Sequence, residues 1–226
     1  MEMKNIIFIY LFLLSSTLLA QEPVLLYGDP IDDEIILDGP VMTKKNNPYP
    51  LSDKQWNVLM KKNEKIIEKY KGQKIAALPE TQKDELLTAM ARQAVLIYTP
   101  AFYRDYGKPV IEVGKFEGMP YLGRKYYEIT FLYDMSKELF TTPYIIKLSI
   151  LEDEGYAIML DYPNDGRFGL YYKTKSEEEI ARKEYLADRT LCKPYCALPE
   201  KRKEKVKNSK EFRKELEYYQ DLLKDK

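Results

Sequence analysis

The fold is decided by residues 126–133, which read YYEITFLY. Two kinds of position alternate along this stretch. One set is largely apolar and consists of Tyr127, Ile129, Phe131 and Tyr133; the other consists of Tyr126, Glu128, Thr130 and Leu132. A period of two residues is typical of a β-strand with one buried face. We therefore expect a strand whose odd-numbered side chains enter the core.

The same period recurs on both sides of this stretch. It predicts an earlier strand at residues 110–116 and later strands at residues 144–151, 156–162 and 168–172. The connections at residues 152–155 and 164–166 are short and contain the Gly, Asp and Asn of tight turns. Short connections join antiparallel neighbours, because a parallel crossover is much longer. The sequence thus predicts an antiparallel meander of four to five strands.

Two helices are expected before the sheet. Ser52 and Gln55 have the spacing of a capping box, and Leu51 and Trp56 that of a hydrophobic staple around it. Gly72 follows the apolar stripe and is expected to end this helix.

The second helix is predicted to begin at a weaker cap pair, Thr81 and Asp84, and to end before Pro100. Its apolar stripe must be buried, and the sheet is the available partner. The fold class is therefore α+β: N-terminal helices, then a curved four- to five-stranded antiparallel meander packed on a helix, then charged C-terminal helices. Over residues 80–173 this order is similar in outline to cystatin-like and NTF2-like (nuclear-transport-factor-like) layouts. No shared motif accompanies the likeness, so it implies an architecture and no activity.

The first 20 residues have the layout of a secretory signal peptide. Lys4 precedes an apolar run at residues 6–14, and Ala20 is a suitable small residue at the cleavage point. The alternative, an uncleaved membrane anchor, is disfavoured because the run is shorter than the roughly 20 residues that span a bilayer. We expect a secreted or periplasmic protein of a bacterial envelope, without a transmembrane span once the signal is removed.

Three regions follow the predicted signal. Residues 21–50 are rich in Pro, Asp and Asn and are expected to be extended, with a short edge strand at residues 34–38. Residues 51–175 form the helix-plus-antiparallel-sheet domain. Residues 176–226 form a charged helical region, in which Ser176 and Glu179 suggest another capping box.

The two cysteines, Cys192 and Cys196, are separated by three residues. In an oxidising compartment they are candidates for a small disulfide loop, with Pro194 holding the turn between them. Free or intermolecularly paired thiols are the alternative. Thioredoxin-like redox chemistry and zinc binding are weaker interpretations, because the first uses a C-x-x-C pair and the second lacks histidine ligands here.

The end of the chain carries a narrow apolar seam on an otherwise charged helix: Phe212, Leu216, Tyr219 and Leu223. This spacing is typical of one face of a helix, but it extends over too few heptads for a coiled coil. One interpretation is a helix packed against the domain. The other is a seam for weak self-association or for docking a partner.

Composition excludes several functions. The chain has no histidine, which removes Ser-His-Asp and Cys-His hydrolase arrangements, and it has no phosphate-binding glycine motif. Its 36 basic and 36 acidic residues cancel, so no basic field for nucleic acid exists. We predict no cofactor and no metal. The remaining catalytic candidates are the strand carboxylates Glu112, Glu128 and Asp161, which would serve a hydrolase or lyase from a pocket between helix and sheet.

Tyrosine is the compositional outlier, with 20 in the chain. One helix cannot bury every tyrosine that the strands carry, and exposed tyrosine is a good contact surface for glycan or protein. The candidates for such a surface are Tyr126, Tyr144, Tyr162, Tyr171 and Tyr172. The leading hypothesis is a non-catalytic binding or structural module whose partner is an envelope protein or a glycan.

Overall fold

The computed structural model describes residues 49–118, 121–163, 166–170, 175–187, 197–198 and 200–224. All of them belong to one compact unit, Ile35–Lys226. The predicted signal peptide, the possible strand at residues 34–38, both cysteines, Tyr171 and Tyr172 lie outside the described residues.

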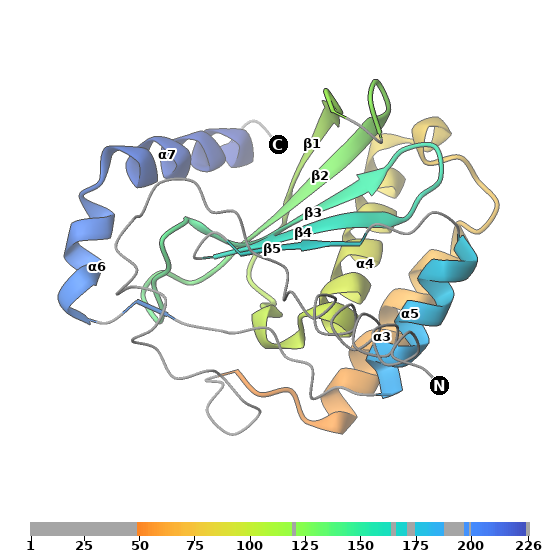
Figure 1. Ribbon diagram of the computed structural model, residues 1–226, viewed down its shortest axis with the longest axis horizontal. Coiled ribbons are helices and arrows are strands. Elements are labelled where there is room, and N and C mark those ends of the chain that lie inside the picture. Colours follow the sequence, from red (N-terminus) through yellow and green to blue (C-terminus); the bar gives the residue numbers. More distant parts are fainter. Residues whose placement is uncertain are drawn as a thin grey trace, which may run out of the picture. The chain divides into compact units, whose positions relative to one another are not determined.

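The sheet confirms the predicted meander (Figure 1). Its five strands are β1 (Val110–Lys115), β2 (Lys125–Leu132), β3 (Tyr144–Leu151), β4 (Ala157–Tyr162) and β5 (Gly166–Gly169). They lie side by side in chain order, and every neighbouring pair is antiparallel. The last strand begins two residues earlier than the sequence predicted, at Gly166. Helices and an antiparallel sheet together make the fold α+β.

The first described helix is α3 (Asp53–Lys69), and its start is the predicted capping box. The Ser52 hydroxyl accepts a hydrogen bond from the Gln55 backbone N–H at 3.3 Å, and the Gln55 side chain accepts one from the Ser52 backbone N–H at 3.0 Å. Trp56 is buried, and its indole N–H donates to the Leu96 carbonyl at 2.9 Å. This bond fixes α3 on the next long helix. Gly72 follows with a φ of +78°, the left-handed conformation expected just after a helix.

The central helix is α4 (Glu80–Tyr98), which packs on β2, β3 and β4. Its start corrects the sequence prediction. The residue before the helix is Pro79, and no side chain caps it, so Thr81 and Asp84 are not a cap pair. The helix ends as predicted before Pro100, and a short 3₁₀ turn, η2 (Pro100–Phe102), follows. Another 3₁₀ turn, η1 (Ile75–Ala77), lies between α3 and α4. Leu87 and Leu96 on α4 and Ile129, Leu148 and Leu160 on the sheet are almost fully buried between the two layers.

Three helices follow the sheet: α5 (Lys175–Ala187), α6 (Glu200–Lys207) and α7 (Lys210–Lys224). Ser176 lies inside α5, one residue after its start, so it does not cap this helix as predicted. The charged C-terminal stretch contains a break, because the Ser209 hydroxyl accepts a hydrogen bond from the Phe212 backbone N–H and starts α7 as a separate helix. In Figure 1, α4 passes behind the strands, α3 and α5 lie at the lower right, and α6 and α7 lie on the left.

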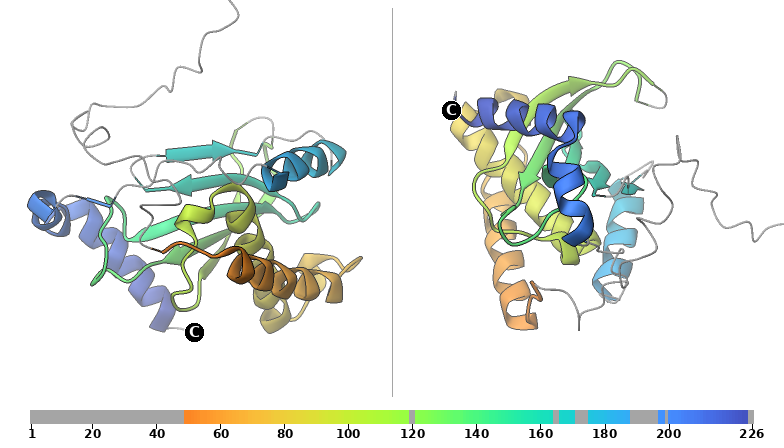
Figure 2. Two further views of the ribbon diagram at one scale, coloured as in Figure 1. Left: turned by 90° about the horizontal axis from the view of Figure 1, so that it is seen from below. Right: turned by 90° about the vertical axis from the view of Figure 1, so that its left-hand side faces the viewer.

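Helix α7 packs on the side of the sheet turned away from α4. Tyr219 of α7 is buried, and its ring meets that of Tyr144 on β3 edge to face, with centroids 6.4 Å apart. The right-hand view of Figure 2 shows α7 crossing in front of the first strands. The sheet therefore has helices on both of its sides, α4 on one and α7 on the other. Among the described residues, no helix is both long enough and apolar enough to cross a membrane.

Candidate functional site

The strand register gathers charged side chains on the side of the sheet that faces α7. Glu112 of β1 is directly opposite Glu128 of β2, and Lys147 of β3 is directly opposite Asp161 of β4. These positions alternate with the core positions Tyr127 and Ile129 and therefore point to the other side of the sheet. We call the surface formed by Glu112, Tyr126, Glu128, Lys147 and Asp161, with Glu215 and Tyr218 from α7, the polar face.

Lys147 is the centre of the polar face. Its ammonium lies 3.7 Å from Glu128 Oε1 and 3.6 Å from Glu215 Oε1, so one cation bridges the sheet and α7. The same nitrogen lies 4.6 Å from the ring centroid of Tyr144 and 5.3 Å from that of Tyr219. A cation close to two aromatic faces gains electrostatic stabilisation from both. Lys147 thus links the sheet to α7 at this point.

Burial and charge shift the titration of this cluster. Burial raises the pKa of Glu128 above the ordinary glutamate value, and Lys147 opposes that shift without cancelling it. For Lys147, burial acts to lower the pKa, but Glu128, Tyr144 and Glu215 outweigh it, and the net pKa is raised. Burial is also the main reason why the pKa values of Tyr144 and Tyr219 lie above that of a free phenol. Lys147 therefore stays charged at neutral pH.

Tyr218 is a candidate binding residue that sequence reasoning missed. Its hydroxyl donates a hydrogen bond to Glu112 Oε1, while 47% of the residue remains exposed. That hydrogen bond is the main reason why the pKa of Tyr218 is raised. The helical period of α7 indicates Tyr219 as an inward residue and Tyr218 as its neighbour. The period gives no sign that Tyr218 reaches a strand 106 residues away in sequence.

An aromatic group borders the polar face at the β1–β2 hairpin. The Phe116 ring lies 4.3 Å from that of Tyr126 and 5.6 Å from that of Tyr121, measured between centroids. Tyr126 lies over its cross-strand partner Gly114, where a Cβ atom would come within 2.3 Å of the Tyr126 ring. A glycine at this strand position leaves the space that the aromatic ring covers. Phe116 and Tyr126 are both half-buried, so part of each ring faces solvent.

The base of this hairpin is held by a cluster of ions. Arg124 donates to Asp153 through two nitrogens, at 3.0 and 2.7 Å, and to Glu154 at 2.5 Å. The bidentate pair fixes the β1–β2 hairpin to the β3–β4 turn. It holds the pKa of Asp153 below its ordinary value through the hydrogen bond from Arg124.

The structure divides the predicted tyrosine surface. Tyr126 and Tyr144 lie on the side of α7, with Tyr144 largely covered by that helix. Tyr162 lies on the opposite, α4 side, with its ring 5.2 Å from that of Phe102. The described candidates are thus divided between the two sides of the sheet, and their role in binding stays a prediction. The alternation of side chains along β4 places Tyr162 with the core residue Leu160.

The apolar seam of α7 is used within the chain. Phe212 is buried with Leu139 and Leu198, Leu216 packs at the edge of that cluster, and Tyr219 is buried against Tyr144. Leu223, at the end of the seam, is 37% exposed. Three of the four predicted seam residues therefore contact the domain itself, and self-association through this seam stays a prediction.

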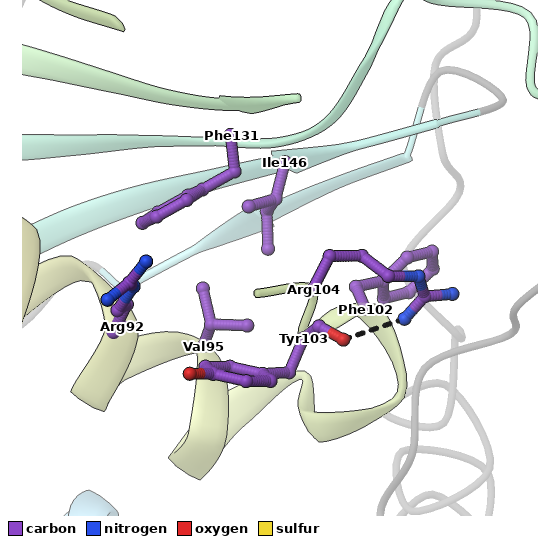
Figure 3. Close-up of a pocket in the computed structure, with 7 residues that line it drawn as sticks. All are labelled: Arg92, Val95, Phe102, Tyr103, Arg104, Phe131 and Ile146. Carbon is purple, nitrogen blue, oxygen red and sulfur yellow. Dashed lines mark hydrogen bonds between the residues drawn. The ribbon is translucent and has the colours of Figure 1, made fainter. Parts of the chain in front are cut away.

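Two of the hollows that the described residues form lie on the α4 side, and neither is lined by Glu112, Glu128 or Asp161. The first lies between α4, η2 and the sheet (Figure 3). It leaves no space of the size of a water molecule. The Arg104 side chain at its edge is buried and forms a bidentate ion pair with Glu138, at 2.5 and 3.0 Å. It also donates to the carbonyls of Ala101 and Tyr103. This arrangement fixes the β2–β3 loop.

The second hollow, which we call the α4 cleft, measures about 150 Å³. It lies between α3, α4, α5 and the β3–β4 hairpin. Its walls are mostly apolar, and Gln93 of α4 and Arg182 of α5 are polar residues within them.

The described residues contain no group of three or more acidic or cysteine side chains that would hold a metal ion. No family model matches this chain, and neither the curated proteins nor the solved structures include one with significant similarity to it. The function must therefore be argued from the surfaces themselves.

Proposed function

We propose that this chain is a non-catalytic binding module and that the polar face, bordered by Phe116, is where it binds. The observation that carries this proposal is the exposed ring of Tyr218 held beside Glu112 by its own hydroxyl. The hydrogen bond fixes the orientation of an aromatic side chain that is open to solvent. A preorganised aromatic surface loses little conformational entropy when a ligand binds.

The charge of the polar face favours a neutral ligand rich in hydroxyl groups. Its described side chains carry four carboxylates, on Glu112, Glu128, Asp161 and Glu215, against the ammonium of Lys147. An anionic ligand would be repelled here. Carboxylates accept hydrogen bonds from hydroxyl groups, and an exposed tyrosine ring stacks on the flat face of a sugar. A neutral glycan of the bacterial envelope fits this chemistry, in agreement with the export predicted from residues 1–20.

A second candidate function is carboxylate-based catalysis, and one observation favours it. Glu112 and Glu128 are cross-strand partners, and burial raises the pKa of Glu128, as general acids require. Against this, Glu128 is paired with Lys147, and Glu112 accepts the hydrogen bond from Tyr218. Both carboxylates therefore already have a partner within the chain in this arrangement. Hydrolysis of aryl glycosides by the wild type, abolished in Glu128→Gln, would favour catalysis over simple binding.

We also propose that the fold resembles cystatin-like and NTF2-like layouts in outline. It is supported by one long helix, α4, packed across an antiparallel meander. The β-bulges between Phe131 and Leu132 and between Ser149 and Ile150 are of the kind that bends a sheet around a helix. The likeness carries no activity.

The chain offers a matched pair of variants for testing the binding proposal. Tyr218 and Tyr106 are both 47% exposed, but Tyr106 lies in the loop before β1 and outside the polar face. We expect purified protein to bind neutral glycans on an array. Tyr218→Ala should weaken that binding about tenfold, since stacking on one aromatic ring contributes on the order of 1 kcal/mol or more. Tyr106→Ala should bind as the wild type does.

The same experiment separates the other outcomes. Equal binding by Tyr218→Ala and Tyr106→Ala would place the binding surface elsewhere on the molecule. If no glycan binds and a cross-linked envelope protein is lost in Tyr218→Ala alone, the polar face binds protein. Concentration-dependent mass in light scattering that is lost in Leu223→Lys would instead support the alternative of self-association.

A further inference from the structure

The α4 cleft is a cavity that the proposed binding function does not use. It lies on the α4 side of the molecule, whereas the polar face lies on the α7 side. Met90, Ala94 and Ile97 of α4 form one wall, and Ile150 and Ala157 of the β3–β4 hairpin form the opposite one. Its volume of about 150 Å³ is well below that of a typical drug-sized pocket. Cavities of this volume bind ligands of about the size of benzene.

Gln93 distinguishes this cleft from a simple packing defect. The residue is only 7% exposed, and it lines the cleft. The oxygen and nitrogen of its side-chain amide are not among the buried polar atoms that lack a hydrogen-bond partner. Because the residue lines the cleft, its amide can offer both a donor and an acceptor to a ligand there.

Arg182 places a positive charge at the same cleft. It is half-buried on α5, and its only described ion pair is a loose one, 3.8 Å from Glu64 Oε1 on α3. This distance is longer than that of a charge-assisted hydrogen bond, about 2.8 Å. A carboxylate on a ligand would form the shorter, bidentate contact and would compete with Glu64 for the guanidinium.

Gly155 of the β3–β4 turn borders the cleft. Gly155 has a φ of +67°, which L side chains rarely adopt, and it lines the cleft beside Met90. A Cβ atom at this position would lie 3.3 Å from Ile75 Cδ1 and 3.8 Å from Met90 Cε. The absence of a side chain at the turn therefore leaves these apolar groups, and the cavity between them, undisturbed.

We propose that the α4 cleft is a binding site for a small aromatic carboxylic acid. The ring occupies the apolar cavity, the carboxylate pairs with Arg182, and a polar ring substituent such as a hydroxyl exchanges hydrogen bonds with Gln93. The three features that select this class are the cavity of benzene size, the amide of Gln93 in its wall, and the weakly paired guanidinium.

The test uses three probes and compares their affinities by ¹H–¹⁵N NMR titration of the purified protein. Benzoate carries the ring and the charge, 4-hydroxybenzoate adds the hydroxyl, and 4-hydroxybenzamide removes the charge. We expect saturable shifts at cleft residues, with 4-hydroxybenzoate binding most tightly. Arg182→Gln should weaken the two acids about tenfold and leave the benzamide unchanged. Lys183→Gln, the adjacent exposed position on α5, is the matched control and should change nothing.

Two further variants decide between the ligand site and a non-specific effect. Glu64→Gln should tighten binding of both acids, because it removes the carboxylate that competes for Arg182. Ala94→Leu fills the cavity and should abolish binding of all three probes; if that variant does not fold, Ala157→Val on the opposite wall serves the same purpose. Folded cavity-filling variants that still bind as the wild type does would overturn the proposal, and so would the absence of saturable shifts in the wild type.

Discussion

The phenol of Tyr218 on α7 donates a hydrogen bond to the carboxylate of Glu112 on β1, which joins the C-terminal helix to the first strand of the sheet. The hydrogen bond is the main reason why the pKa of Tyr218 lies above that of a free phenol, since the ionised phenolate would face the Glu112 carboxylate. We expect Glu112→Gln to lower the pKa of Tyr218 toward its ordinary value. NMR titration of the tyrosine rings measures this shift, and Glu211→Gln on the same helix is the control. A Tyr218 pKa that is unchanged in Glu112→Gln would contradict the contact.

Glu128 makes the free energy of unfolding depend on pH, and the shift of its pKa gives the direction of this dependence. Its pKa is raised by burial in the folded state and is ordinary, near 4.5, in the unfolded chain. Between those two values the folded state binds more protons, so the contribution of Glu128 to the free energy of unfolding falls as the pH rises. We expect the free energy of unfolding of Glu128→Gln, minus that of the wild type, to increase as the pH rises through this window. Urea unfolding at a series of pH values measures the difference.

A second variant tests the role of Lys147, whose charge lowers the pKa of Glu128. Lys147→Met removes this cation and should raise the pKa of Glu128 further. It should also weaken the docking of α7, because Glu215 loses its partner. Carboxyl ¹³C shifts report the first effect, and faster amide exchange in α7 reports the second. If neither changes, Lys147 is not the centre of the polar face.

The buried pair of Arg104 and Glu138 should be costly to break. Both side chains are about 95% covered, with 5% and 4% exposed, and they share two hydrogen bonds. Glu138→Gln should lower the free energy of unfolding by about 3 kcal/mol, because it leaves a buried guanidinium without its counter-charge. The more exposed pair of Arg92 and Asp105 is the control, and Asp105→Asn should cost less than about 1 kcal/mol.

Replacing both partners of the buried pair separates its net contribution from the cost of an unpaired charge. Arg104→Met combined with Glu138→Leu should lose less stability than the sum of the single changes. Strictly additive losses in chemical denaturation would mean that the two side chains are not coupled.

The close contact between Gly114 and the ring of Tyr126 can be tested with a single substitution. Gly114→Ala places a methyl group where the end of the Tyr126 ring lies, so the ring must move away from Phe116. We expect a loss of about 1 kcal/mol, since the far end of a side chain can shift without moving the backbone. In the wild type, the Hα protons of Gly114 should show an upfield ring-current shift that disappears in Tyr126→Leu. Ordinary glycine shifts in the wild type would contradict this packing.

Export and the state of the cysteines are checked on protein recovered from its native cell. We expect the mature chain to begin at Gln21 and to be lighter than the reduced form by two hydrogens, because Cys192 and Cys196 are predicted to pair. Retention of Met1 in a cytosolic fraction would contradict the signal peptide, and reactive thiols in the exported protein would contradict the pairing.

The sequence by itself determined the elements of the sheet and their order. The two-residue period at residues 126–133 and at its neighbours predicted the strands, and the short turns predicted the meander that the structure confirms. The capping box at Ser52 and the helix end before Pro100 were also predicted from the sequence and are confirmed. These features depend on interactions between residues close in sequence, so a local pattern contains the information. The cap pair at Thr81 was predicted wrongly, because the packing of α4 outweighs one weak capping signal.

Only the tertiary structure decided which residues meet on the polar face. The alternation of β2 shows that Glu128 points away from the core, but the pairing of Glu112 with Glu128 and of Lys147 with Asp161 depends on strand register. Tyr218 and Glu215 join them through the docking of a helix from the far end of the chain. The α4 cleft likewise needs Gln93 and Arg182 from different helices. Contacts between distant segments depend on how the layers pack, which no local period along the chain records.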